Sequence, residues 1–225
     1  MDDTSDDEYY QPGEVAERLF FTDADGESTE PDSAIAAALD GDWERLEPEA
    51  AQLLADESAG AYDRYLAMSA LARWASPIGY AAVREAALDP DAQPWREMSV
   101  DRLYSLDNTF AMLTQSVVDS VEEAGQRGTA AERLAALTAL IGIADQAYFD
   151  HNLSPSGLFN EDIEQLRGPI EAAIEHGLGE LAAAPAEVAL PRWVRSQVEE
   201  LINALGLVDK AAADAYLARL APETP

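Results

Sequence analysis

Apolar side chains recur at intervals of three and four positions along most of this chain, which is the spacing of an amphipathic α-helix. Segment 131–150 shows it best, with one wide apolar stripe made of Leu134, Leu137, Leu140, Ile141, Ala144 and Tyr148. No segment shows the strict alternation of polar and apolar residues that marks a half-buried strand. The pattern therefore predicts an all-α fold, with helices over residues 13–21, 31–40, 42–57, 61–75, 78–88, 108–125, 131–150, 161–184, 192–206 and 209–221.

Turn-forming residues set the ends of several of these helices. Ser76 and Pro77 separate helix 61–75 from helix 78–88, which Asp89 and Pro90 then stop. Proline is tolerated in a first helical turn rather than mid-helix, so we expect Pro48 near the start of its helix.

Two further positions carry local expectations. The sequence Gly-Leu-Gly at 177–179 predicts a break in helix 161–184. Trp95 follows Pro94 and is expected to open a helix with its indole half exposed. Trp74, by contrast, shares an apolar stripe with Ala70 and Leu71 and is expected in the core.

Two helices of the chain resemble each other. The segments "RYLAMSALARWA" (64–75) and "RLAALTALIGIA" (133–144) match at both ends and in the middle. Matched pairs are Arg64/Arg133, Ala67/Ala136, Ser69/Thr138, Ala70/Ala139, Leu71/Leu140 and Ala75/Ala144. Their separation fits two helical hairpins of about 35 residues each, a length typical of helical repeats.

Residues 63–92, "DRYLAMSALARWASPIGYAAVREAALDPDA", resemble a HEAT-like repeat, and residues 133–160 resemble it more weakly. The likeness lies in an Ala-x-x-Ala-Leu first helix, a proline at the corner, an Ala-Ala-Val second helix and a closing Leu-Asp-Pro-Asp. The resemblance implies an α-solenoid of the HEAT/armadillo type, a right-handed stack of antiparallel helical hairpins. It also implies a concave face that binds other macromolecules.

Composition divides the chain into a tail and one domain. Residues 1–12 are too acidic and too poor in apolar side chains to fold, so we expect a disordered tail. Residues 13–225 suffice for a single helical, repeat-like domain with a substantial core. The chain has no cysteine, no uninterrupted apolar run of membrane-spanning length and no signal-peptide pattern, which favours a cytoplasmic location.

The formal net charge of -30 limits the classes of molecule that this chain is expected to bind. Nucleic acids and anionic membranes carry the same sign of charge, so direct binding to either is not expected. Residues 1–57 hold 19 acidic side chains but only two arginines, which is more than half of the net charge in a quarter of the chain. This concentration favours a basic protein partner, because opposite potentials speed association.

We therefore expect a non-catalytic protein-binding module whose acidic end captures that partner. One specific form is an immunity or antitoxin-type inhibitor that covers the cationic active site of a nuclease toxin. The expected contacts are Asp40, Asp42, Glu44, Glu47, Glu49, Asp56 and Glu57, with Tyr62 or Tyr65 as an aromatic anchor and Asp2, Asp3, Asp6, Asp7 and Glu8 adding charge.

Two alternatives remain. The first is a cytosolic adaptor or assembly factor with the same architecture, and the second is an enzyme or ligand carrier with a pocket between helices. Catalytic motifs are lacking, and neither His151 nor His176 has a partner at metal-ligand spacing. Loop 21–32 contains Asp-x-Asp-Gly, but Phe21 occupies the first ligand position of a calcium loop. No cofactor or metal is therefore expected.

Overall fold

The computed structural model describes residues 10–23, 25–100, 105–184 and 192–220. These residues form twelve α-helices and two 3-10 turns, and their only β-type pairing is two isolated bridges, which confirms the all-α prediction. The helices are α1 (Glu14–Phe20), α2 (Pro31–Ala37), α3 (Trp43–Ala55), α4 (Ala61–Arg73), α5 (Pro77–Ala86), α6 (Thr109–Asp119), α7 (Val121–Arg127), α8 (Ala130–Ile141), α9 (Asn160–Gln165), α10 (Arg167–Ala183), α11 (Arg192–Leu205) and α12 (Lys210–Arg219). The 3-10 turns are η1 (Ala38–Asp40) and η2 (Pro90–Ala92).

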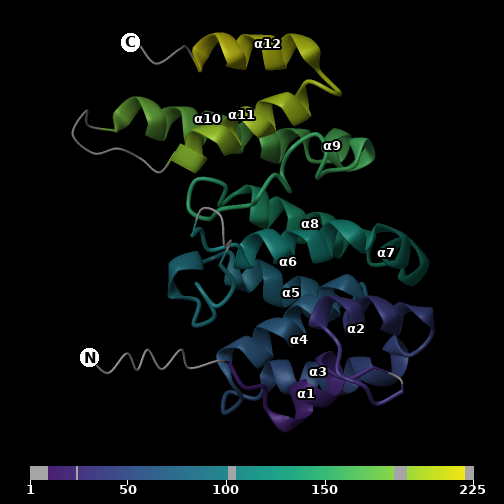
Figure 1. Cartoon of the computed structure of the whole chain (residues 1–225). Coiled ribbons are helices and arrows are strands. Elements are labelled where there is room, and N and C mark those ends of the chain that lie inside the picture. Colours follow the sequence, from purple (N-terminus) through teal and green to yellow (C-terminus); the bar gives the residue numbers. More distant parts are fainter. Residues whose placement is uncertain (1–9, 24, 101–104, 185–191, 221–225) are drawn as a thin grey trace, which may run out of the picture.

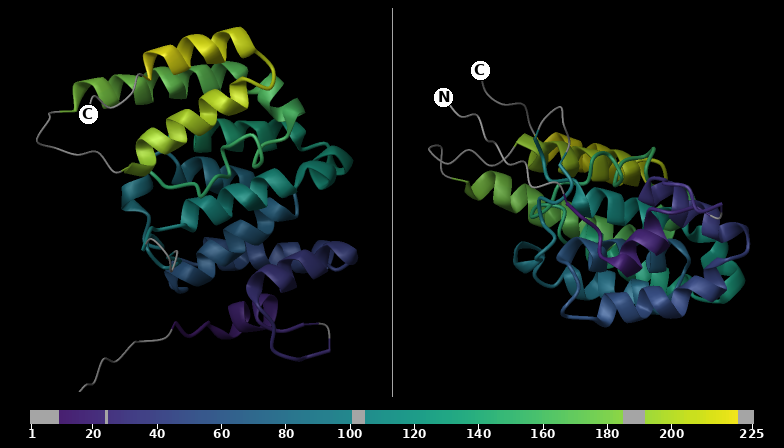
Figure 2. Two further views of the ribbon diagram at one scale, coloured as in Figure 1. Left: turned by 45° about the horizontal axis from the view of Figure 1, so that its top comes forward. Right: turned by 60° about the horizontal axis from the view of Figure 1, so that its bottom comes forward.

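The helices are layered in nearly the order in which they occur in the chain (Figure 1). Helix α4 packs against α3, α5 and α6, and α8 packs against α5, α6 and α7. The C-terminal part continues through α10, α11 and α12, each in contact with the next (Figure 2). Most contacts therefore join helices that are close in sequence.

Helix α4 is buried around most of its circumference because its side chains are apolar or small on every face. All residues from Tyr65 to Ala72 are buried. A Cβ atom at Gly79 of α5 would lie 2.4 Å from the backbone nitrogen of Ala72, so only glycine permits this crossing. Helix α5 starts one residue earlier than predicted, with Pro77 in its first turn and the Ser76 hydroxyl accepting from the Ile78 amide at 3.3 Å.

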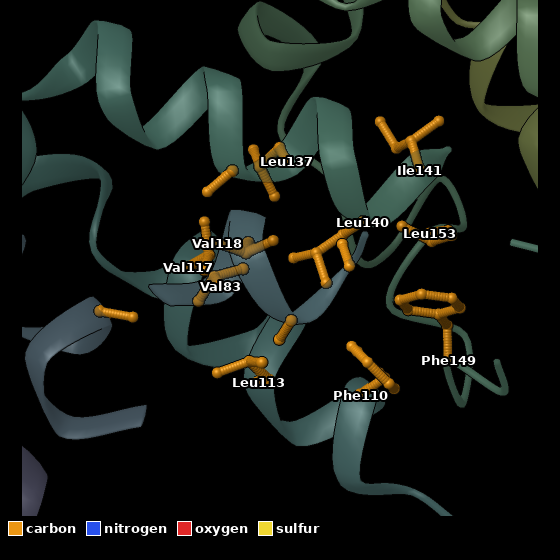
Figure 3. Packing of buried hydrophobic residues seen from close by; sticks show 14 of the residues in the cluster. Val83, Phe110, Leu113, Val117, Val118, Leu137, Leu140, Ile141, Phe149 and Leu153 are labelled. Carbon is orange, nitrogen blue, oxygen red and sulfur yellow. The ribbon is translucent and has the colours of Figure 1, made fainter. Parts of the chain in front are cut away.

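The core continues from α1 to Leu220, the residue that follows α12, as one cluster of buried hydrophobic side chains. Its central part brings together α5, α6, α8 and the segment that follows α8 (Figure 3). The side chains that meet there include Val83, Leu113, Val117, Leu137, Leu140, Phe149 and Leu153.

Several predicted helices end earlier than the sequence pattern indicates, and the helix expected over 161–184 is divided at Leu166 into α9 and α10. The helix expected over 108–125 is divided at Ser120, whose hydroxyl donates to the Val117 carbonyl at 2.8 Å and contacts the Tyr80 hydroxyl. The helix expected over 131–150 ends at Ile141. Beyond it, Gln197 of α11 accepts from the Phe149 amide and donates to the Ala147 carbonyl, which replaces helical hydrogen bonds.

Three local expectations are wrong. Helix α10 runs unbroken through Gly177, where Val198 of α11 packs so closely that a Cβ atom would lie 2.4 Å from it. Pro48 lies inside α3 rather than in its first turn, at an exposed position where water can satisfy the freed carbonyl. Trp95 lies in a turn and is buried, whereas Trp74 is in the core as predicted.

The N-terminal end of the described chain is held by Asp63, a buried carboxylate of α4. It accepts hydrogen bonds from the Tyr10 hydroxyl and, at 3.1 Å, from the Gly13 amide. The Tyr10 ring also meets the Tyr62 ring edge-on at 4.7 Å. Residues 1–9 of the predicted tail lie outside the described residues, whereas Tyr10 packs on the helical domain.

Candidate protein-binding surface

Two of the carboxylates predicted to bind a partner are used inside the protein. Both oxygens of Glu47 accept from Nη2 of Arg127, at 2.9 and 3.0 Å. Glu49 forms a two-point ion pair with Arg18 of α1, with one of the contacts at 2.8 Å. Hydrogen bonding from Arg18 lowers the pKa of Glu49. Neither carboxylate is left without a counter-charge.

The Arg127 guanidinium connects α7 to the N-terminal helices. It lies 4.3 Å over the Trp43 ring, and its Nη1 donates to the Trp74 carbonyl at 2.6 Å. The side chains of Arg127 and Glu47 are 20% and 19% exposed. Glu47 is thus a structural partner of Arg127 rather than a free surface charge.

The other five predicted carboxylates are exposed on η1, on α3 and just after α3. Asp42 makes only a long contact of 3.5 Å with Arg45. Asp56 accepts from the amide and hydroxyl of Ser58, and these hydrogen bonds lower its pKa. No ion pair within the described residues involves the remaining three, which are Asp40, Glu44 and Glu57.

The two tyrosines differ in their availability. Tyr65 is 1% exposed, and its hydroxyl donates to the Thr109 carbonyl at 2.8 Å, so its ring cannot anchor a partner. Tyr62 is half-buried between Tyr10 and Tyr65, onto which it stacks at 5.5 Å. The predicted carboxylates Asp2, Asp3, Asp6, Asp7 and Glu8 lie outside the described residues.

At the C-terminal end of α3, next to Glu57, lies a hollow that the sequence did not predict. It has a volume of about 660 Å³ and is bounded by α3, α4, α5 and the turn at residues 93–95. We call it the α3–α5 hollow. Met68, Ala86 and Trp95 are its buried lining residues, whereas Ile78 is 48% exposed. The lining side chains of α5 are mostly alanines.

A second hollow of about 630 Å³ lies on the other side of α5, against α8. Ala81 and Glu85 line both hollows, so α5 forms a ridge between them. Leu88, just beyond the end of α5, lines the second hollow and is 84% exposed. The rest of its lining mixes small apolar side chains with polar and charged ones, which are Ala135, Ala139, Thr138 and Arg84.

The sequence did contain a signal for this surface. Tyr80, Val83 and Ala86 form the buried stripe of α5. Ile78 and Leu88 lie off that stripe, and a large apolar residue on the polar side of a short helix indicates a second contact face.

Other candidate chemistry is sparse in the described part of the chain. His151 pairs with Glu200, and His176 lies 3.3 Å from Asp145. No group of three or more His, Asp or Glu side chains among the described residues is arranged to hold a metal ion. The Asp23 carboxylate is instead occupied by the amides of Asp25 and Glu27, as in an ordinary acidic turn.

None of the described helices is long and apolar enough to cross a membrane. Comparison of the sequence with family models, with curated proteins and with solved structures gives no match. The surface around α3 and α5 therefore has to be interpreted from its own chemistry.

Proposed function

We propose that this chain is a non-catalytic protein-binding module that captures a basic protein partner. The observation that carries the proposal is that some acidic side chains at η1 and around α3 are paired with arginines and others are not. Glu47 and Glu49 are neutralised by arginines, whereas Asp40, Glu44 and Glu57 are exposed and have no ion pair within the described residues. Uncompensated charge of one sign steers an oppositely charged protein toward the surface that bears it.

We also propose that the helices form a HEAT-like α-solenoid. Supporting this, the matched residues Arg64 and Arg133 have similar roles. Nε of Arg64 donates to the carbonyl of Leu54 in α3, and Nε of Arg133 donates to the carbonyl of Val117 in α6. Each arginine thus binds backbone of an earlier helix, as expected of equivalent positions in a repeat.

The specific form of the proposal is a cytoplasmic inhibitor of the immunity or antitoxin type. Carboxylates placed on a nuclease active site take positions that substrate phosphates would take, because both are anionic oxygen ligands for Arg and Lys. An adaptor or assembly factor would bind a basic partner equally well without inhibiting it. Nuclease activity measured with and without the module separates these two forms.

The charge proposal is tested with the triple variant Asp40→Asn, Glu44→Gln, Glu57→Gln. A matched control removes three exposed carboxylates elsewhere, through Glu161→Gln, Glu164→Gln and Glu180→Gln. With a partner isolated by affinity capture, the first variant should slow association roughly tenfold at low salt and change dissociation little. The difference should shrink as salt screens the charges.

The control variant should associate at close to the wild-type rate, since its carboxylates lie on α9 and α10. Equal slowing by both variants would mean that only total charge matters and would reject a localised acidic site. Unchanged rates for both variants, at low and high salt, would reject capture through charge altogether.

A further inference from the structure

The α3–α5 hollow is an open, largely apolar trough lined in part by the exposed carboxylates Glu57 and Glu85. Its volume of about 660 Å³ corresponds to roughly twenty waters at the density of the liquid. It exists because α3 and α5 both pack on α4 while their facing side chains are small. Ala55, Ala61, Ala81, Ala82 and Ala86 all line it.

Alanine walls let another backbone approach closely, and Met68 and Trp95 present an adaptable apolar floor. Along the exposed side of α5, Ile78, Ala81 and Glu85 succeed one another at intervals of three and four. This is the ridge spacing onto which a second helix packs. A helix with side chains is about 10–12 Å across, and it reaches into such a trough through residues on one face.

The charged side chains at the hollow indicate which sign of charge a bound helix should carry beside its apolar face. Glu57 is at the α3 side and Glu85 is at the α5 side, and neither is in an ion pair within the described residues. Arg64 is the single basic side chain in the lining, and its Nε is engaged by the Leu54 carbonyl. Two acidic rims around an apolar trough are complementary to a helix with an apolar face and basic flanks.

We propose that the α3–α5 hollow receives an amphipathic helix of the partner. Apolar side chains from successive turns of that helix enter the hollow, and its flanking Arg or Lys side chains pair with Glu57 and Glu85. This inference rests on the proposed function, since it assigns a binding element to the basic partner. In this arrangement the exposed carboxylates speed association of the partner, and the hollow slows its dissociation.

The direct test uses a synthetic helical peptide of about four turns. It carries Leu at every third and fourth position and Arg on both flanks, and a companion peptide has Gln in place of every Arg. Ala81→Trp and Ala82→Trp place an indole in the hollow from an exposed and a half-buried position. Ala172→Trp adds the same side chain at an exposed position of α10 and serves as the matched control.

The Arg peptide should bind the wild-type chain, and each of the two hollow variants should weaken binding about tenfold or more. The Ala172→Trp chain should bind within about twofold of wild type. Glu57→Gln with Glu85→Gln should weaken the Arg peptide and leave the Gln peptide unchanged. A photo-reactive Leu at the centre of the peptide should label residues of α3, α4, α5 or the turn at residues 93–95.

The proposal is overturned if the wild-type chain does not bind the Arg peptide, if all three Trp variants bind it equally, or if the label falls outside the residues that line the hollow. Binding rates measured with the captured partner distinguish failure of this proposal from failure of the proposed function. A partner that dissociates from Ala81→Trp and Ala82→Trp as slowly as from wild type, yet associates slowly with the charge-neutralised triple variant, would remove the helix-binding role and leave basic-protein capture intact.

Discussion

Arg133 of α8 and Asp162 of α9 form a buried ion pair with two parallel contacts, Nη1 to Oδ1 and Nη2 to Oδ2, each at 2.8 Å. Their side chains are only 3% and 5% exposed. The same guanidinium donates to the carbonyls of Val117 and Val118, both at 2.8 Å. One side chain therefore joins the end of α6 to α8 and α9, and its charge is compensated by a single carboxylate.

Replacing the Asp162 carboxylate should lower the stability of the fold. We expect Asp162→Asn to lower the free energy of unfolding by about 3 kcal/mol, because it leaves the buried Arg133 charge without its partner. Urea denaturation measures the change. Glu175→Gln, which removes an exposed ion pair with Arg219, should leave the urea midpoint almost unchanged. Similar effects of the two substitutions would contradict a special role for the buried pair.

The close crossing of α4 and α5 makes a second prediction. Gly79→Ala should lower the free energy of unfolding by about 1–3 kcal/mol, since the added methyl group meets backbone atoms of Leu71 and Ala72. Gly179→Ala in α10 has no neighbour within 4 Å of the added Cβ and should stabilise the protein by about 0.5–1 kcal/mol. Thermal and urea denaturation compare the stabilities of the two variants. A destabilised Gly179→Ala would show that α10 needs glycine for another reason.

Tyr65 provides a test that separates stability from binding. Its burial raises the pKa of its hydroxyl well above the usual value, and that hydroxyl donates to the Thr109 carbonyl. Tyr65→Phe removes this buried hydrogen bond, so we expect a loss of about 1–2 kcal/mol in unfolding free energy. Tyr62→Phe, at a half-buried ring whose hydroxyl has no hydrogen bond within the described residues, should change stability little. An altered partner association rate in Tyr65→Phe, with Tyr62→Phe unchanged, would contradict the assignment of Tyr65 to the core.

Glu200 of α11 should make stability depend on pH. Burial raises the pKa of its carboxyl, the contact with His151 opposes this, and its Oε2 is buried without a hydrogen-bond partner. A raised pKa in the folded state means that this state binds the proton more tightly than the unfolded chain. The stability contributed by Glu200 is therefore present below its ordinary pKa and is lost as pH rises through the folded-state value.

Glu200→Gln carries no charge at any pH and should become more stable relative to wild type between about pH 4 and pH 7. Urea denaturation at both pH values measures this difference. Glu199→Gln, at the exposed neighbouring position, is the control. A Glu200→Gln advantage that stays constant over this range would show that the shift of the carboxyl pKa does not affect folding.

The helical class of this fold follows from the spacing of apolar residues, but several helix ends do not. Helix α8 stops at Ile141 while its apolar stripe continues, because Gln197 binds backbone groups after it. Helix α10 continues through Gly177, where Val198 of α11 packs into the space that a Cβ atom would otherwise occupy. Both determinants come from α11, so no local pattern contains them.

The candidate site was predictable in its charge and not in its shape. The excess of acidic residues before position 58 predicts where a basic partner would bind. The sequence did not show that Arg127 and Arg18 occupy Glu47 and Glu49, since those partners are 80 and 31 residues away. The hollow depends on how three helices cross, which single-helix periodicity does not determine.

The Arg127 contacts have a consequence for synthesis on the ribosome. Glu47, Trp43 and the Trp74 carbonyl meet their cation only after residue 127 has left the exit tunnel. Until then the emerging α3–α4 unit carries an unmatched acid and an uncovered indole ring. The Arg127 contacts that join α3 and α4 to α7 can therefore form only after the α7 segment has been synthesised.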